Sequence, residues 1–138
     1  MPYSWSKKSL GLLECLHPDM RRVVDLVMSW QVMDLTVVRT KTTPELQAEK
    51  VKGGFSKTLN SKHLTDAHGF AGAVDLAPYP VDWKDEKRFG VLMGLMIAAA
   101  KVQGVQVRVG GNWDGDNDFH DNTPEDPGHF ELVNFRPA

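Results

Sequence analysis

The chain has 138 residues, of which 41% are hydrophobic and 25% are charged, and its net charge is −2. This length suits one compact domain with a buried core, so we expect a single domain over residues 1–138. The pI of about 6.2 argues against a protein that follows the phosphates of a nucleic acid. A single cysteine, Cys15, excludes an internal disulfide.

The N-terminal half is expected to contain three helices and one strand. Residues 6–16 carry apolar side chains at helical spacing after a serine, and Pro18 is placed to open a second helix over residues 17–30. The β-branched segment 34–40 predicts a strand. A Thr-Pro start and paired glycines delimit a short helix over residues 43–54.

The C-terminal half combines strands with one long helix. A buried strand is predicted over residues 72–79, and the longest helix over residues 81–104, with acidic residues early and Gly104 as its end. Two more strands are expected over residues 105–111 and 129–135. Helices followed by strands and one long helix predict an α+β fold with a small, largely antiparallel sheet packed by helices.

The N-terminal sequence carries no export signal. It lacks the long apolar stretch and the small-residue cleavage site of a secretory signal. No apolar run reaches the roughly 18–20 residues that a membrane-spanning helix needs. We therefore expect a protein without a membrane anchor that stays in the cytoplasm until another factor releases it.

Histidines and carboxylates are the candidate metal ligands, because one cysteine is too few for a thiolate zinc site. His17 precedes Pro18 at a helix junction and is interpreted as a capping or surface residue. In "EDPGHFELV", Asp126 and His129 lie three residues apart across a Pro-Gly turn, a spacing that is also typical of surface loops. The remaining candidates are His63, His68, His120 and the carboxylate of Asp75.

Two ordered motifs, "SKH…GAVD" and "DPGH", resemble those of the zinc D,D- and L,D-peptidases of the VanY and D-alanyl-D-alanine carboxypeptidase type. The match is closest to short tailed-phage endolysins that are L-alanyl-D-glutamate peptidases. It extends over nearly the whole chain, through "VVRT", "GGFSKTLNSKH", "VDLAPY" and "GGNWDGDNDFHD". The resemblance implies a fold similar to that of the hedgehog and D-Ala-D-Ala peptidase domains.

The resemblance also implies a metal site. It assigns His63, Asp75 and His129 as ligands of one catalytic zinc ion, and Asp126 as the general base. Zinc held by two neutral imidazoles and a carboxylate keeps a net positive charge, which suits it to lower the pKa of a water molecule and to polarise an amide carbonyl. A carboxylate beside it suits the transfer of a proton from water to the leaving amine.

Two further residues match the family pattern. Arg39, in "VVRT", corresponds to an arginine thought to hold the substrate near the metal, and a guanidinium suits a substrate carboxylate or a developing oxyanion. Taken alone, Arg39 would be interpreted as one half of a structural salt bridge. Ser61 matches the first position of the first motif, where its hydroxyl either bonds a substrate group or shapes the loop.

The first zinc ligand has two candidates. The family spacing from histidine to aspartate is usually seven residues, whereas His63 lies twelve residues before Asp75 and His68 lies seven before it. Either "DAHGF" is a loop insertion and His63 keeps its "SKHLT" context, or His68 is the ligand and the "SKH" match is accidental. The second interpretation puts Asp66 where serine is expected and Ala71 where glycine is expected, so we favour His63.

The segment "DGDNDFHDNTPE" suggests a second metal site. Its acidic residues fall at positions 1, 3, 5 and 12 of an EF-hand-like loop, and carboxylate oxygens suit calcium. Position 6 is Phe119, where a glycine is expected, so a solvated acidic loop is the alternative interpretation. The candidate calcium ligands are Asp114, Asp116, Asp118 and Glu125.

The resemblance implies a zinc-dependent peptidoglycan endopeptidase, a phage endolysin that cleaves the L-alanyl-D-glutamate bond of stem peptides for host lysis. The alternatives are a D-Ala-D-Ala carboxypeptidase or dipeptidase, and a non-catalytic cell-wall-binding module. The short chain without an export signal favours the endolysin, and Asp126 argues against the binding module. We expect a monomer that binds bacterial peptidoglycan, with neither nucleic acid nor membrane as a partner.

Overall fold

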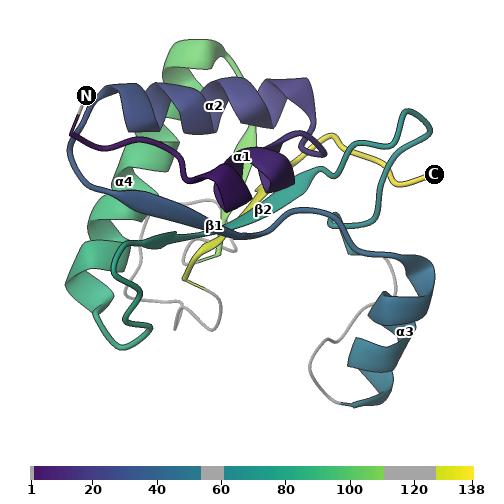
Figure 1. The fold of residues 1–138 in the computed structure, drawn as a ribbon. Coiled ribbons are helices and arrows are strands. Elements are labelled where there is room, and N and C mark those ends of the chain that lie inside the picture. Colours follow the sequence, from purple (N-terminus) through teal and green to yellow (C-terminus); the bar gives the residue numbers. More distant parts are fainter. Residues whose placement is uncertain (1, 54–60, 111–126) are drawn as a thin grey trace.

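The computed structural model describes residues 2–53, 61–110 and 127–138 (Figure 1). The helices are α1 (Lys7–Leu13), α2 (Pro18–Ser29), α3 (Pro44–Lys52) and α4 (Glu86–Gln103). The strands are β1 (Leu35–Arg39), β2 (Ala73–Pro78), β3 (Val107–Val109) and β4 (His129–Leu132).

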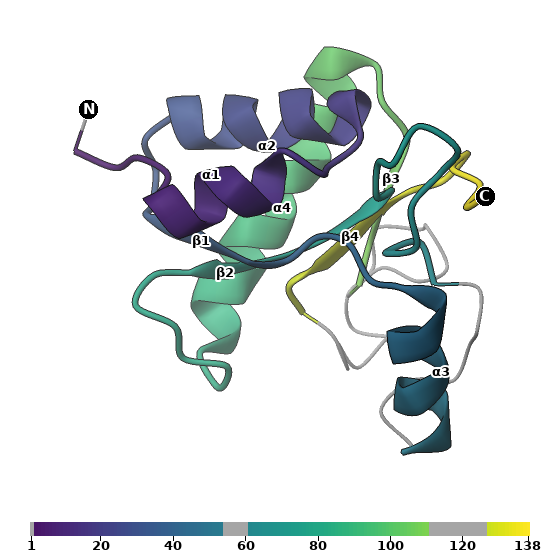
Figure 2. The ribbon, with the colours of Figure 1, turned by 45° about the vertical axis from the view of Figure 1, so that its right-hand side comes forward.

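The four strands form one sheet in the order β1-β2-β4-β3, and each neighbouring pair is antiparallel. This arrangement confirms the predicted α+β fold with an antiparallel sheet. Figures 1 and 2 show α1, α2 and α4 gathered around the sheet, whereas α3 lies apart from them, beyond the end of β1. Segments far apart in the sequence therefore meet at the central strands β2 and β4.

Within the described ranges, none of the helices has both the length and the apolarity to cross a lipid bilayer.

The core lies between the sheet and the helices α2 and α4. Each large apolar side chain that is fully buried contributes about 1.5–3 kcal/mol to folding. The core includes Val23, Val24 and Val27 from α2, Val74 and Leu76 from β2, Leu92 and Met96 from α4, and Phe130 from β4.

Helix α1 covers the free edge of β1. The backbone N–H of Val37 donates a hydrogen bond of 3.0 Å to Oγ of Ser9, and the hydroxyl of Thr40 donates one of 2.7 Å to the carbonyl of Leu12. An uncovered strand edge would expose backbone groups that pair with other chains. The same contacts fix the C-terminal end of β1, where Arg39 and the following Thr40 lie.

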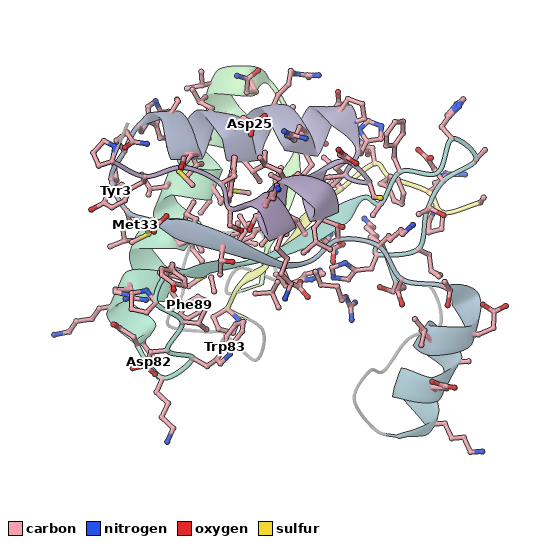
Figure 3. The ribbon with its side chains drawn as sticks, viewed as in Figure 1. Tyr3, Asp25, Met33, Asp82, Trp83 and Phe89 are labelled. Carbon is pink, nitrogen blue, oxygen red and sulfur yellow. The ribbon has the colours of Figure 1, made fainter. Side chains whose placement is uncertain are left out.

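Helix α4 begins five residues later than the predicted helix over residues 81–104. Asp85 caps it, because its side chain accepts a hydrogen bond from the backbone N–H of Arg88 at 3.2 Å. The residues before the cap make a turn in which Trp83 stacks on the buried Phe89, with ring centroids 5.4 Å apart (Figure 3). The helix is therefore shorter than predicted because its acidic start acts as a cap.

Helix α1 also ends earlier than predicted, at Leu13 instead of residue 16. The chain leaves the helix to pair with the segment before β2. The N–H of Ala71 donates to the carbonyl of Cys15 at 2.8 Å, and the N–H of His17 donates to the carbonyl of Ala71 at 2.8 Å. This tertiary contact anchors the loop that precedes β2 to the N-terminal part of the chain.

Candidate metal centre

The register of the two central strands places His129 directly opposite Asp75. Gly128 makes this pairing possible, because a Cβ atom there would lie 2.1 Å from the carbonyl oxygen of Leu76. The N–H of Leu76 donates to the carbonyl of Gly128 at 2.8 Å. The Pro-Gly turn therefore delivers His129 to the sheet at the position of Asp75.

A β-bulge in β1 brings Arg39 to the same face of the sheet. Val37 pairs with Leu76 and Arg39 pairs with Asp75, so Val38 is one extra residue between the two pairs. In a regular strand Arg39 would lie on the same face as the buried Val37, because side chains alternate with a period of two. The extra residue reverses this alternation and turns Arg39 toward Asp75.

His63 approaches the same point from the loop before β2. Its side chain is only 2% exposed, and its backbone N–H donates to Oγ of Ser61 at 3.2 Å. Its ring nitrogen Nδ1 bonds the carbonyl of Thr40, and Nε2 lies 3.1 Å from Oδ1 of Asp75. The hydroxyl of Ser61 thus shapes the loop, which is one of the two roles predicted for it.

The two imidazoles and the carboxylate converge on one point. One ligand atom from each of His63, Asp75 and His129 lies within 4.8 Å of the other two. The distance from Nδ1 of His129 to Oδ1 of Asp75 is 2.9 Å. Three ligand atoms this close together could hold one metal ion.

The hydrogen-bond partners of the two rings also fit a cation. Nδ1 of His63 faces a carbonyl and Nε2 of His129 lies 2.9 Å from Oε1 of Glu131, so both of these nitrogens carry protons. In neutral imidazoles the opposite nitrogens then present lone pairs to Asp75, which is itself an acceptor. A divalent metal ion satisfies all three acceptors, and the outward N–H bonds orient the rings as in known metal sites.

The pKa values of both carboxylates of the site lie below their usual range. In the absence of an ion, a proton on either facing ring nitrogen allows it to donate to Asp75. Burial raises the pKa of Asp75, but these hydrogen bonds from His129 and His63 lower it more, so the pKa lies well below its usual range. Burial likewise raises the pKa of Glu131, and the hydrogen bond with His129 and the charge of Lys62 bring it below the usual value. Asp75 is therefore a charged ligand candidate at neutral pH.

His68 is not part of this group. It is exposed in a turn, where its backbone N–H donates to Oδ1 of Asp66 at 2.9 Å. His17 caps α2, as predicted, because its Nδ1 accepts from the N–H of Asp19 at 3.1 Å. Several predicted site residues lie outside the described residues, namely Asp126, His120 and the acidic residues Asp114, Asp116, Asp118 and Glu125.

The segment "DAHGF" forms a closed turn beside the site. The N–H of Asp66 donates to the carbonyl of Phe70 at 2.8 Å, and the N–H of Phe70 returns a bond of 3.0 Å to Oδ1 of Asp66. Thr65 and Ala71 pair across the base of this turn. A self-contained turn of this kind agrees with an insertion between His63 and Asp75.

Two charged residues of the site were not predicted from the sequence. Oε2 of Glu131 lies 3.2 Å from Nζ of Lys62, which also donates to the carbonyls of Leu132 at 2.8 Å and Val133 at 3.0 Å. Glu131 follows His129 by two residues in a strand, so the sequence already indicated that the two side chains lie on the same face of the sheet. Nothing in the local sequence indicates that Lys62 contacts Glu131, because the two residues lie far apart in the chain.

Comparison with known proteins identifies the family. The family model described as phage L-alanyl-D-glutamate peptidase matches residues 1–133. The L-alanyl-D-glutamate peptidase of Escherichia phage T5 is 29% identical over 142 residues, which cover 96% of this chain and 100% of the relative. The crystal structure of the L-Ala D-Glu endopeptidase ChiX of Serratia marcescens matches with a TM-score of 0.75 and 27% identity, over 94% of this chain and 90% of that chain. The chain therefore belongs to the phage L-alanyl-D-glutamate peptidase family.

Proposed function

We propose that this protein is a zinc-dependent peptidoglycan endopeptidase, a phage endolysin that cleaves the L-alanyl-D-glutamate bond of stem peptides for host lysis. The observation that supports it most is the convergence of His63, Asp75 and His129 on one point, in a chain of this peptidase family. Residues 1–138 would then form one catalytic domain.

In this proposal His63, Asp75 and His129 hold the zinc ion, which, when bound, polarises the scissile carbonyl and makes water nucleophilic at neutral pH. The carboxylate of Asp126 accepts a proton from the attacking water and passes it to the amine of the departing D-glutamate. The charge of Asp75 offsets part of the charge of the ion, and the two neutral imidazoles leave the rest to act on the substrate.

Arg39 is proposed to hold the substrate. Its Nε is buried and has no hydrogen-bond partner among the described residues, and it lies 3.7 Å from Oδ2 of Asp75. A guanidinium beside the metal ligands suits a free carboxylate, and stem peptides carry such groups. The hydroxyl of Ser61 accepts a bond from His63, so its own proton is available to a substrate acceptor.

We also propose that Asp114, Asp116, Asp118 and Glu125 bind calcium, from their spacing in the sequence. A calcium ion held by these side chains, which come shortly before Asp126 in the sequence, would stabilise the loop that leads to Asp126 and so support activity. The test is activity of chelator-treated protein after zinc is restored, measured across a calcium titration. Activity that rises with calcium supports the site, whereas a flat response contradicts it.

The scissile bond is tested by digesting purified peptidoglycan and identifying the new ends by mass spectrometry. Wild type is compared with Asp126→Asn, with chelator-treated protein and with protein to which zinc has been returned. The proposal predicts new amino-terminal D-glutamate, no free D-alanine, and loss of activity in the variant and on chelation. Release of D-alanine would indicate a carboxypeptidase, and no cleavage by folded, zinc-loaded protein would indicate a binding module.

We infer that the active form is a monomer that reaches the cell wall after release from the host cytoplasm. A small enzyme that acts on a fixed polymer needs no partner subunit when its candidate ligands all come from one chain, as they do here. Light scattering coupled to size-exclusion chromatography measures the mass of the active species directly. A stable dimer would contradict this inference.

A further inference from the structure

Lys62 connects the two segments that carry the imidazoles. It directly precedes His63, and the N–H of Gly72 donates to its carbonyl at 2.8 Å. Its side chain crosses to β4, where Nζ contacts the carbonyls of Leu132 and Val133 and the carboxylate of Glu131. One lysine thus ties the loop of His63 to the end of the strand that begins at His129.

We propose that Lys62 and Glu131 are positioning residues that act as one unit, a brace that fixes the two imidazoles relative to each other for metal binding. Glu131 would set the ring of His129, and Lys62 would hold Glu131 and the loop of His63 in place. This inference rests on the proposed metal site.

Glu131 determines which nitrogen of His129 faces the metal. Its Oε1 accepts from Nε2 of His129 at 2.9 Å, so the proton is held on Nε2 and the lone pair of Nδ1 points to Asp75. A carboxylate partner of this kind orients a ligand ring and raises its basicity. Loss of Glu131 would remove the bond that keeps the proton on Nε2.

Lys62 directs the carboxylate of Glu131. A glutamate next to a divalent ion is itself a potential ligand, because carboxylate oxygens bind such ions. Nζ of Lys62 holds Oε2 while His129 holds Oε1, so both oxygens have partners other than the metal. The side chains of Lys62 and Glu131 are only 20% and 13% exposed, so this pair is screened less than a surface ion pair.

The test measures zinc affinity by competition with a chelator, together with the tautomer of His129 by ¹⁵N NMR. Glu131→Ala is expected to weaken zinc binding about 10–100-fold and to lose the Nε2–H form of His129. Glu131→Gln should retain that form and bind zinc more tightly than Glu131→Ala, because its amide oxygen accepts the same bond. Lys62→Met should also weaken binding, and Lys62→Met should have a smaller effect in the Glu131→Ala background than alone.

Exposed residues supply matched controls, Glu14→Ala and Lys87→Met, which should bind zinc like the wild type. Circular dichroism and urea unfolding confirm that each variant is folded. If Glu131→Ala does not fold, Lys62→Met and Glu131→Gln decide, since each preserves the size of the side chain. Folded variants with the zinc affinity and the His129 tautomer of the wild type would overturn the brace. A wild-type protein that binds no zinc would instead overturn the proposed function, and the brace with it.

Discussion

A substitution of Arg39 distinguishes a role in metal binding from a role in substrate binding. Its guanidinium lies 3.7 Å from Asp75, where a positive charge repels a cation. Arg39→Met should therefore bind zinc at least as tightly as the wild type, while kcat/KM on peptidoglycan fragments falls about 100-fold through loss of a charged donor. Arg22→Met, on the exposed surface of α2, is the control. Weaker zinc binding by Arg39→Met would instead make Arg39 a structural partner of Asp75.

Gly128 is the residue on which the approach of β4 to β2 depends. In Gly128→Ala the new Cβ would meet the carbonyl of Leu76 at 2.1 Å, so β4 must move and carry His129 with it. We expect a loss of about 1–3 kcal/mol in the free energy of unfolding and weaker zinc binding. Urea unfolding of the metal-free protein and chelator competition measure the two effects.

Gly94 provides the opposite case for comparison. It is exposed on α4, and a Cβ there would have no neighbour within 4 Å. Gly94→Ala should stabilise the protein by about 0.5–1 kcal/mol, because alanine favours the helix, and should leave zinc binding unchanged. If Gly128→Ala is as stable as the wild type and binds zinc equally well, the close approach of the two strands is not required.

At the scale of elements, the insertion between His63 and Asp75 makes a direct prediction. Deletion of residues 66–70 restores the seven-residue spacing of the family, and Thr65 and Ala71 already pair at the base of the turn. The shortened protein should fold and should bind zinc with an affinity within about tenfold of the wild type, the lower end of the loss seen when partners of metal ligands are removed. Chelator competition measures this affinity. A folded deletion variant that binds no zinc would show that the turn takes part in the metal site.

The types and order of the described elements were predictable from the sequence, but their ends and one irregularity were not. Periodicity and caps gave each helix and strand, whereas α1 stops early because Cys15 pairs with Ala71. The bulge at Val38 decides which face Arg39 occupies. Since a bulge is set by the pairing of two distant strands, the sequence of β1 alone contains no signal for it.

For the molecule as a whole, the residues of the site that belong to sequence motifs were predictable. The residues that only the fold brings to the site were not. The first and second motifs named His63, Asp75 and His129, and the structure brings these three together. The contact between Lys62 and Glu131 joins residues 69 positions apart. The bond from Gly72 to the carbonyl of Lys62 and the pairing of β2 with β4 bring them together.

We propose that His63, and not His68, completes the zinc site with Asp75 and His129. The most direct measurement is the zinc content of wild type, His63→Ala and His68→Ala after equilibrium dialysis, determined by inductively coupled plasma mass spectrometry. We predict one zinc ion per chain in the wild type and in His68→Ala, and none in His63→Ala, since two remaining ligands hold the ion too weakly. A folded His63→Ala variant that keeps its zinc, or a His68→Ala variant that loses it, would show that His63 is not the ligand.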